Sequence, residues 1–353
     1  MKKMKKTTAL ILLAVFLAIP VLSCSGKKNS DTTDKLTVIY PASHISVAVV
    51  AVARLKDYFK EEGLDVEFIT LSSGQIEALS IGKADLYING IIPTLSYAAQ
   101  GADVKIVGGT KSGGNFFIAT KKNAENLRDV KNWVGKKLGV VRLSTSEMVT
   151  HYALEEHGID VRKDITYVEI DTYPNIIEGV RKGLTDIGAI DPEYLQSARD
   201  LGLEVIFPMT DLSPNYICCR ETAYKKSLET KPTAFVKFLK AQIRGYKYFL
   251  ENRNESAKLL AEASSQEEER LYNLMYTPEV NGHRTFNPDP DLNRTRKIWT
   301  VLEDWDYIEK NVVKIEDIFD TTFYKRALDE LIKENPKDEF YKQLLEDFNN
   351  NNA

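Results

Sequence analysis

The chain has 353 residues, of which 43% are hydrophobic and 28% are charged, and its formal net charge at pH 7 is −4. This composition is typical of a globular protein, and the length suggests two compact units. The acidic balance argues against nucleic acid as a partner, because binding to nucleic acid depends on basic patches. A small ligand is not excluded, since a local site can oppose the net charge.

The N-terminal segment has the pattern of an export signal. Four lysines among the first six residues precede an apolar run from Ala9 to Val21, which is shorter than the roughly 20 residues of a membrane span. The Leu-Ser-Cys sequence that follows resembles a bacterial lipobox. We therefore expect a signal peptide at residues 1–23 and a lipid anchor at Cys24, with an ordinary signal peptide and a chance cysteine as the alternative.

An exported chain of this kind would be lipid-anchored at the cell membrane, on its extracytoplasmic face or in the periplasm. Loss of the four lysines would lower the net charge from −4 to −8. Residues 24–35 are polar without an apolar period and predict a flexible tether. Residues 341–353 end in a run of asparagines and are expected to form a tail.

Between these ends the chain contains one α/β unit twice. Several residues recur 101 positions later, among them Ile76, Gly82, Asp85, Gly101 and Val104. Each copy alternates strands with helices, and a proline near the start of a helix, Pro93 or Pro192, follows a strand in each. Such alternation predicts parallel sheets covered on both faces, and hence two α/β lobes. Chance likeness of two α/β stretches is the alternative.

The remainder of the chain, from about Thr222, is predicted to be helical. Apolar residues with helical spacing occupy the stretches 234–250, 299–308 and 323–332, and a polar loop runs from Pro278 to Pro290. We interpret the tryptophans of this region as packing residues.

Cys218 and Cys219 are adjacent, so a structural disulfide between them would be strained. They lie in a segment that predicts a buried strand, and we interpret them as small core residues, with a redox or thiol role as the alternative. The four histidines lack metal-ligand spacing, and no Cys-x-x-Cys sequence occurs. The sequence therefore predicts no metal site and no cofactor.

Together these features resemble one family, the extracytoplasmic solute-binding proteins of ABC importers, and within it the nitrate/sulfonate/taurine and thiamine-precursor branch. The resemblance covers about residues 36–335. The segments that carry it are Tyr40-Pro41, Glu61 to Val66, Ser73-Gly74, Gly82 to Asp85, Gly135 to Val140 and Pro232 to Ala241.

The resemblance implies a two-lobe periplasmic-binding-protein fold of type II, with a hinge of two crossover strands and a helical C-terminal extension. It assigns residues 36–113 and 217–340 to the first lobe with its C-terminal helices, and residues 114–216 to the second. It also implies a monomer that has a permease and an ATPase as partners and catalyses no reaction.

Ligands of parallel sheets bind beyond the carboxyl ends of the strands, where helix N-termini offer unpaired N–H groups. Small polar residues occur at this edge in both copies, although serine and threonine there can also simply cap helices. The predicted ligand-binding residues are Tyr40, Ser43, His44, Ser73, Gly74, Thr110, Ser112, Asn115, Ser144, Thr145, Ser146, Asp191 and Tyr194.

This set favours an anion of the sulfonate, nitrate or taurine type, or a related organic acid. Aromatic residues such as Tyr40, Phe116, Tyr173 and Tyr194 keep a thiamine-precursor pyrimidine or a flavin-like ring as the alternative. An enzyme resembling the thiamine-pyrimidine synthases is less favoured, because those cytosolic enzymes carry a cysteine-rich motif that this chain lacks. A surface sensor is the third hypothesis. The sequence has no Gly-x-Ser-x-Gly or phosphate-binding P-loop pattern.

Overall fold

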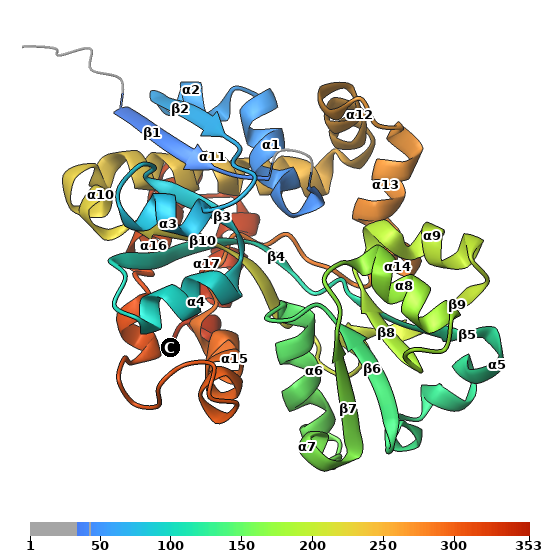
Figure 1. The fold of residues 1–353 in the computed structure, drawn as a ribbon. Coiled ribbons are helices and arrows are strands. Elements are labelled where there is room, and N and C mark those ends of the chain that lie inside the picture. Colours follow the sequence, from blue (N-terminus) through green and yellow to red (C-terminus); the bar gives the residue numbers. More distant parts are fainter. Residues whose placement is uncertain (1–33, 42–43) are drawn as a thin grey trace, which may run out of the picture. The chain divides into compact units, whose positions relative to one another are not determined.

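Two five-stranded sheets form the framework of the computed structural model, which describes residues 34–41 and 44–353 (Figure 1). The expected signal peptide, the lipid anchor at Cys24 and the site candidate Ser43 lie outside the described residues and stay predictions. None of the helices in the two described ranges has the length and apolar character needed to cross a membrane.

The first sheet has the strand order β2-β1-β3-β10-β4. Its strands are β1 (Asp34–Ile39), β2 (Leu64–Ile69), β3 (Leu86–Gly90), β4 (Val104–Ser112) and β10 (Ile217–Tyr224). β1 is parallel to β2 and β3, whereas β10 is antiparallel to β3 and β4. The connecting helices are η1 (Ile45–Val47), α1 (Ala48–Leu55), α2 (Tyr58–Glu61), α3 (Gln75–Ser80) and α4 (Ile91–Ala99).

The second sheet repeats this arrangement in the order β7-β6-β8-β5-β9. Its strands are β5 (Phe116–Thr120), β6 (Lys136–Val140), β7 (Ile165–Glu169), β8 (Ile187–Ile190) and β9 (Leu203–Pro208). β6 is parallel to β7 and β8, and β5 is antiparallel to β8 and β9. The helices are α5 (Lys121–Ala124), η2 (Asn126–Arg128), η3 (Val130–Trp133), α6 (Thr145–Glu156), α7 (Val161–Asp164), α8 (Tyr173–Arg181), η4 (Pro192–Tyr194), α9 (Leu195–Asp200) and η5 (Met209–Asp211).

In each sheet the fourth strand arrives by a crossover from the other sheet, because β5 follows β4 and β10 follows β9. This arrangement confirms the duplicated α/β unit and the predicted two-lobe fold with two crossovers. The prediction of purely parallel sheets was wrong for β5 and β10. A parallel neighbour needs a long, usually helical crossover, whereas these two strands enter by short loops and run in the opposite direction. The exact residues that divide the lobes stay a prediction.

The C-terminal region is helical, as predicted. Its helices are α10 (Lys225–Thr230), α11 (Pro232–Glu251), α12 (Arg253–Ser264), α13 (Glu268–Tyr276), α14 (Pro278–Asn281), α15 (Leu292–Asp304), η6 (Ile315–Ile318), α16 (Thr322–Glu334) and α17 (Glu339–Asn351). α11 packs closely on α1, since a Cβ on Gly245 would lie 2.8 Å from the Cβ of Ala53. α15 instead contacts α6 of the second lobe, where Lys297 pairs with Glu156 at 2.7 Å.

The segments predicted as tether and tail both overlap regular structure. β1 begins at Asp34, inside the segment predicted as tether. Helix α17 replaces most of the tail expected at residues 341–353. Its side chains Tyr341, Leu344 and Phe348 lie at helical spacing and are buried. The polar asparagines at the end of the chain obscured this apolar stripe.

Gly114 lies in the first crossover with φ +109°, a backbone conformation that L-residues rarely adopt. A Cβ there would lie 3.1 Å from Cδ of Arg284. We expect Gly114→Ala to lower the free energy of unfolding by about 2 kcal/mol, from backbone strain and crowding together. Gly135, at φ +78° with nothing within 4 Å, is the matched control. Its alanine variant should cost only about 1 kcal/mol in urea unfolding, and equal costs would contradict the crowding argument.

Candidate functional site

Helix N-termini and crossover strands of both lobes meet at one pocket of about 230 Å³. Six of the predicted site residues line it, and they come from both lobes. They are His44, Asn115, Ser144, Thr145, Ser146 and Asp191. We call this cavity the cleft pocket.

The other described candidates lie outside the lining of the cleft pocket. The Tyr40 hydroxyl accepts a hydrogen bond from Arg54 at 2.9 Å, and its ring packs on Phe68. Ser73 and Gly74 are exposed in the turn before α3. Thr110 and Ser112 of β4 and Tyr194 of η4 also lie outside the lining. Their role in ligand binding stays a prediction without geometric support.

The N-terminus of α6 contributes backbone N–H groups to the cleft pocket. The Ser144 hydroxyl caps the helix by accepting from the N–H of Glu147 at 3.1 Å, and the Glu147 carboxyl accepts from the N–H of Leu143 at 2.5 Å. Thr145 and Ser146 occupy the first turn, whose N–H groups have no partner within the helix. Ser144 is therefore both a cap and a pocket residue, so the two interpretations of this serine are compatible.

The N-terminus of α4 faces the same cavity from the first lobe. Its Ncap residue Gly90 provides no side-chain cap, and Gly90, Ile92 and Pro93 line the cleft pocket. An uncapped helix start carries partial positive charge. Two helix N-termini thus converge on one small volume.

Lys111 is the buried cation of the cleft pocket, with 1% of its surface exposed. Its Nζ lies 3.7 Å from Oδ1 of Asp191. Burial by itself lowers the pKa of Lys111, but the Asp191 carboxylate together with Cys218 and Cys219 holds the pKa above its usual value. The side chain is therefore charged at neutral pH.

Sequence reasoning named Thr110 and Ser112 and missed the lysine between them. Successive residues of a strand point to opposite faces. Ser112 lies on the other side of β4, where its hydroxyl accepts from Arg220 at 3.2 Å, and Thr110 is fully buried. Strand alternation was the signal that could have identified Lys111.

Asp191 is held in place by a chain of hydrogen bonds. Nδ2 of Asn115 donates to its Oδ1 at 2.6 Å, and the hydroxyl of Tyr216 donates to Oδ1 of Asn115 at 2.7 Å. With Lys111 nearby, the carboxylate is both hydrogen-bonded and charge-balanced, as a buried charge requires.

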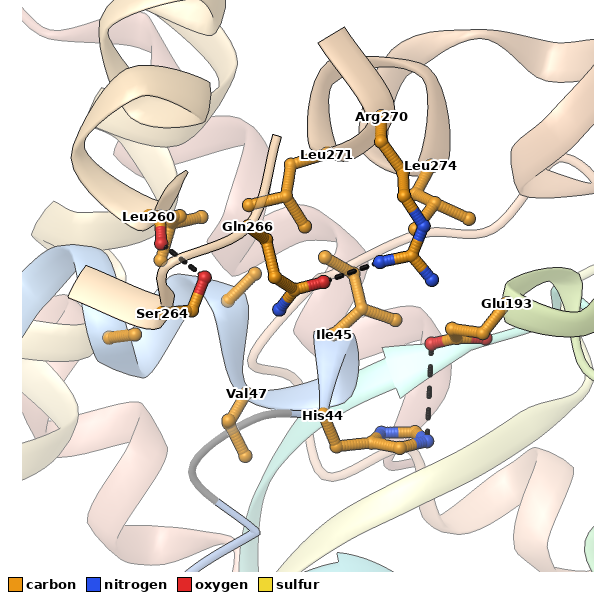
Figure 2. Close-up of a pocket in the computed structure, with 12 residues that line it drawn as sticks. His44, Ile45, Val47, Glu193, Leu260, Ser264, Gln266, Arg270, Leu271 and Leu274 are labelled. Carbon is orange, nitrogen blue, oxygen red and sulfur yellow. Dashed lines mark hydrogen bonds and ion pairs between the residues drawn. The ribbon is translucent and has the colours of Figure 1, made fainter. Parts of the chain in front are cut away.

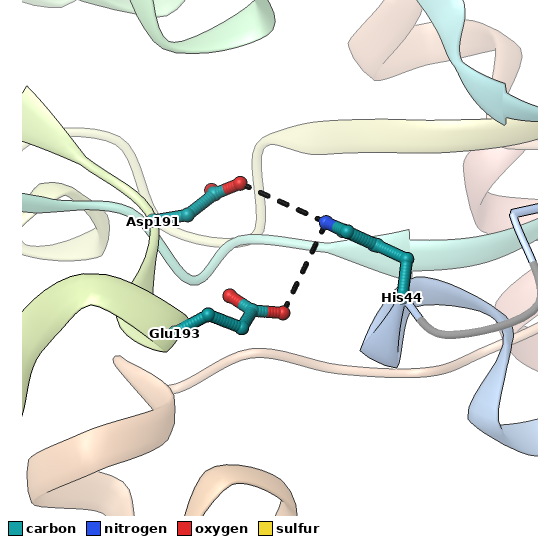
Figure 3. Close-up of side chains that lie close together, drawn as sticks. All are labelled: His44, Asp191 and Glu193. Carbon is teal, nitrogen blue, oxygen red and sulfur yellow. Dashed lines mark ion pairs between the residues drawn. The ribbon is translucent and has the colours of Figure 1, made fainter. Parts of the chain in front are cut away.

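A cluster of His44, Asp191 and Glu193 joins the two lobes beside the cleft pocket (Figure 3). Nε2 of His44 lies 3.9 Å from Asp191 and 3.9 Å from Glu193. Burial lowers the pKa of His44, which is therefore mainly neutral at pH 7. Burial opposes ionisation of Glu193, but Arg284, whose Nη1 is 3.6 Å away, is the main group that holds its pKa below the usual range.

The ligand atoms of this cluster lie within 4.8 Å of one another and are of the types that bind divalent cations. Sequence spacing could not predict the grouping, because the residues come from different lobes. Lys111 and Arg284 already balance the two carboxylates. We therefore interpret the two carboxylates as members of ion pairs with Lys111 and Arg284, beside a His44 that is mainly neutral.

A second cavity of about 100 Å³ shares His44 with the cleft pocket and is also lined by Glu193 (Figure 2). Leu260, Leu271 and Leu274 line it, and the Gln266 side chain accepts a hydrogen bond from Arg270 at 2.5 Å. This cavity is smaller than the cleft pocket and largely aliphatic. It offers fewer groups that could recognise a polar solute.

Several further lining residues were absent from the predicted ligand-binding set, although Tyr173 was considered as a residue for a ring ligand. They include Tyr87, Asn89, Leu143, Tyr173, Cys218 and Cys219. Asn89 lies next to the end of β3, and the repeat offset of 101 pairs it with Ile190, so the repeat did not point to it. Tyr194, which was predicted, packs against Tyr173 with ring centroids 5.3 Å apart. Arg142 is exposed, and its Nε lies 3.6 Å from Glu169.

Comparison with known proteins identifies the family. Residues 44–256 match the sequence model of a family described as NMT1/THI5 like, which is more than half of the chain. The chain belongs to the NMT1/THI5-like family. A member of such a family can be a binding protein or an enzyme, as the names of its relatives show.

Two relatives from Bacillus subtilis are named as binding proteins. The binding protein YtlA is 26% identical over 301 residues, which cover 82% of this chain and 87% of YtlA. A protein named for binding aliphatic sulfonates is 25% identical over 344 residues, which cover 93% of this chain and 98% of that protein. A 4-amino-5-hydroxymethyl-2-methylpyrimidine phosphate synthase from Candida albicans is 24% identical over 246 residues, or 64% of this chain and 70% of the enzyme.

Solved structures support the fold assignment. The aliphatic sulphonate binding protein SsuA from Escherichia coli superposes with a TM-score of 0.63 at 19% identity, covering 81% of this chain and 91% of SsuA. The nitrate-binding protein NrtA from Synechocystis superposes with a TM-score of 0.65 at 14% identity, covering 85% of this chain and 89% of NrtA. At such identities the likeness establishes the periplasmic-binding-protein fold.

Proposed function

We propose that this member of the NMT1/THI5-like family is the solute-binding component of an ABC importer and captures a small anion in the cleft pocket. The solute would be of the sulfonate, nitrate or taurine type, or a related organic acid. The observation that carries the proposal is the buried Lys111 ammonium in a pocket where the N-termini of α4 and α6 converge.

These groups suit an anion for a physical reason. Helix N-termini present N–H donors and partial positive charge, and a buried ammonium forms charge-assisted hydrogen bonds with oxyanions. The Asp191 carboxylate offsets part of the charge of Lys111. It could also accept a hydrogen bond from an amino group, as a taurine-type zwitterion would provide.

A thiamine-precursor pyrimidine is the alternative, supported by Tyr87 and Tyr173 in the lining and by the synthase relatives. The cavity of about 230 Å³ is small beside typical ligand sites of roughly 300–1,000 Å³. That size favours a compact solute over a flavin-like ring.

The remaining parts of the proposal rest on the family and on the sequence. The chain would bind without catalysing a reaction, deliver its solute to a permease and an ATPase, and act as a monomer. It would be exported and held at the membrane by a lipid on Cys24. The sulfonate- and nitrate-binding proteins among its relatives and structural neighbours support this role.

A thermal-shift screen with the purified full-length chain tests the proposal. The solutes would include methanesulfonate, taurine, nitrate, a thiamine pyrimidine and riboflavin. A ligand at 100 times its Kd should stabilise the fold by about 2.7 kcal/mol. Stabilisation by the pyrimidine alone would favour a thiamine-precursor binder. If no solute stabilises the chain, the result would favour a surface sensor over an importer component.

Ser146→Ala should weaken binding of the active solute about 3- to 10-fold, because it removes a hydroxyl from the pocket lining. Ser73→Ala is the matched control, since Ser73 is exposed and outside the pocket. Isothermal titration of both variants gives the two affinities. Equal losses, or a loss only in Ser73→Ala, would contradict the placement of the solute.

A further inference from the structure

Cys218 and Cys219 are a pair of free thiols in the wall of the cleft pocket. Both side chains line the cavity, both are buried, and their Sγ atoms lie 3.4 Å apart. Neighbouring residues of a regular strand point to opposite faces of a sheet. Two adjacent thiols in one pocket therefore require a local departure from strand geometry.

A β-bulge in β10 supplies that departure. On β4, Ser112 pairs with Ile217 and Lys111 pairs with Cys219, so Cys218 has no pairing partner of its own there. Bulges of this kind re-aim side chains next to functional sites. The bulge is the physical reason why both thiols reach the cleft pocket.

The surroundings give the two thiols different reactivity. The hydrogen bond with Cys219, aided by the charge of Lys111, lowers the pKa of Cys218 to about 7 despite its burial. The same hydrogen bond and burial raise the pKa of Cys219 well above its usual value. A thiolate is the nucleophile in thiol–disulfide exchange. Cys218 is also the more exposed of the two residues, at 9% against 3%, so we assign Cys218 as the attacking thiol and Cys219 as the resolving one.

We propose that Cys218 and Cys219 are a redox-active pair whose oxidation to a vicinal disulfide strengthens anion binding in the cleft pocket. The effect on affinity rests on the proposed function. The oxidant is a compact small-molecule disulfide, such as bis(2-hydroxyethyl) disulfide, whose size suits the cleft pocket of about 230 Å³. In an exported protein the surroundings favour such oxidation.

The exchange balances in two steps. The Cys218 thiolate attacks one sulfur of the small disulfide, forms a mixed disulfide and releases one thiolate. Cys219 then gives up its proton and attacks Sγ of Cys218, which expels the second thiolate. Two cysteine thiols have lost two hydrogens, and the small disulfide has become two thiols.

The geometry makes this disulfide easy to reduce, and its formation changes the charge near Lys111. Adjacent Cα atoms lie about 3.8 Å apart, below the roughly 4.4–6.8 Å usual for disulfides, and strained disulfides are readily reduced. Oxidation also removes the negative charge that a Cys218 thiolate places near Lys111. The ammonium then interacts more fully with an anionic ligand.

Intact mass and affinity, measured on the full-length chain carrying Cys24→Ser, test the proposal. After treatment with bis(2-hydroxyethyl) disulfide we expect the chain to lose two hydrogens, and dithiothreitol to restore them. The oxidised form should bind methanesulfonate at least about fivefold more tightly than the reduced form. Cys219→Ser should trap mercaptoethanol as a mixed disulfide on Cys218, whereas Cys218→Ser should stay largely unmodified.

Thiols that stay reduced under excess disulfide would overturn the proposal. So would a Cys218–Cys219 disulfide that leaves methanesulfonate affinity unchanged or weaker. If no anion binds in either redox state, the proposed function and the coupling both fail, while the mass measurement still decides separately whether the pair oxidises.

Discussion

Replacing Lys111 with methionine is expected to weaken binding of the anionic solute by about 100-fold or more. The substitution removes a hydrogen bond to a charged group, which contributes about 1.5–3 kcal/mol, from a site where water cannot replace it. It also leaves Asp191, 3.7 Å away, as a buried carboxylate that repels the ligand. Isothermal titration with the best solute of the screen would measure the loss.

Two further variants test whether the loss of affinity depends on the position of the lysine and whether repulsion by Asp191 contributes to it. Lys121→Met removes a cation that is exposed and 3.9 Å from Glu204, outside the pocket, and should leave the affinity unchanged. Lys111→Met combined with Asp191→Asn removes both charges and should recover part of the lost affinity if repulsion by Asp191 contributes. Binding within threefold of the parent chain by Lys111→Met, with an unchanged melting temperature, would contradict the role given to this lysine.

The fold was largely predictable because the same α/β unit occurs twice in the sequence. The 101-residue offset linked Gly82 and Asp85 to their counterparts, and the two sheets indeed share one strand order. The direction of the strands within each sheet was harder to predict. β5 and β10 come from crossovers, and the sequence of a buried strand does not encode whether its neighbours are parallel to it.

The site was predictable where position along an element decides it. Ser144, Thr145 and Ser146 follow a strand and begin a helix, so they had to lie at the ligand edge of the sheet. The sequence could not indicate how far each loop reaches into the cavity. Ser73 and Gly74 occupy the equivalent edge in the first lobe, yet they are exposed and outside the pocket.

Groupings that join distant segments could not be predicted. His44 and Glu193 come from different lobes, and only folding brings them to 3.9 Å. The two cysteines were interpreted as small core residues with a thiol role as the alternative. Burial fits the first interpretation and their place in the pocket fits the second, because the bulge that turns Cys218 toward the cavity leaves no mark in the sequence.

Acid is expected to destabilise the fold through His151, by about 2 kcal/mol between pH 7 and pH 5. His151 is 1% exposed on α6, and neither ring nitrogen has a hydrogen-bond partner among the residues that the structure describes. Its ring lies between Tyr167 and Trp305, with centroids 4.4 Å and 3.8 Å away. Burial, with a smaller contribution from Arg162, lowers the pKa of His151 to about 3.

The loss of stability in acid follows from proton uptake by the unfolded chain. Below its ordinary pKa of 6.5 the unfolded histidine binds a proton that the folded histidine cannot bind until the pH approaches 3. The contribution of the neutral His151 to the stability of the fold is therefore fully present above pH 6.5 and is lost as the pH falls toward 3. The slope approaches about 1.4 kcal/mol per pH unit.

The pH profile of the parent chain alone does not isolate this effect, because Glu147 acts in the opposite direction. Burial raises the pKa of Glu147 from 4.5 to about 7, so its contribution to stability grows as the pH falls through that range. The decisive quantity is the difference in free energy of unfolding between His151→Phe and the parent chain, measured in urea from pH 7 to pH 5. That difference should shift by about 2 kcal/mol in favour of the variant, whereas Glu147→Gln should shift the opposite way. A difference that does not change with pH would show that His151 titrates normally in the folded chain, and that its pocket is open to water or to a proton acceptor.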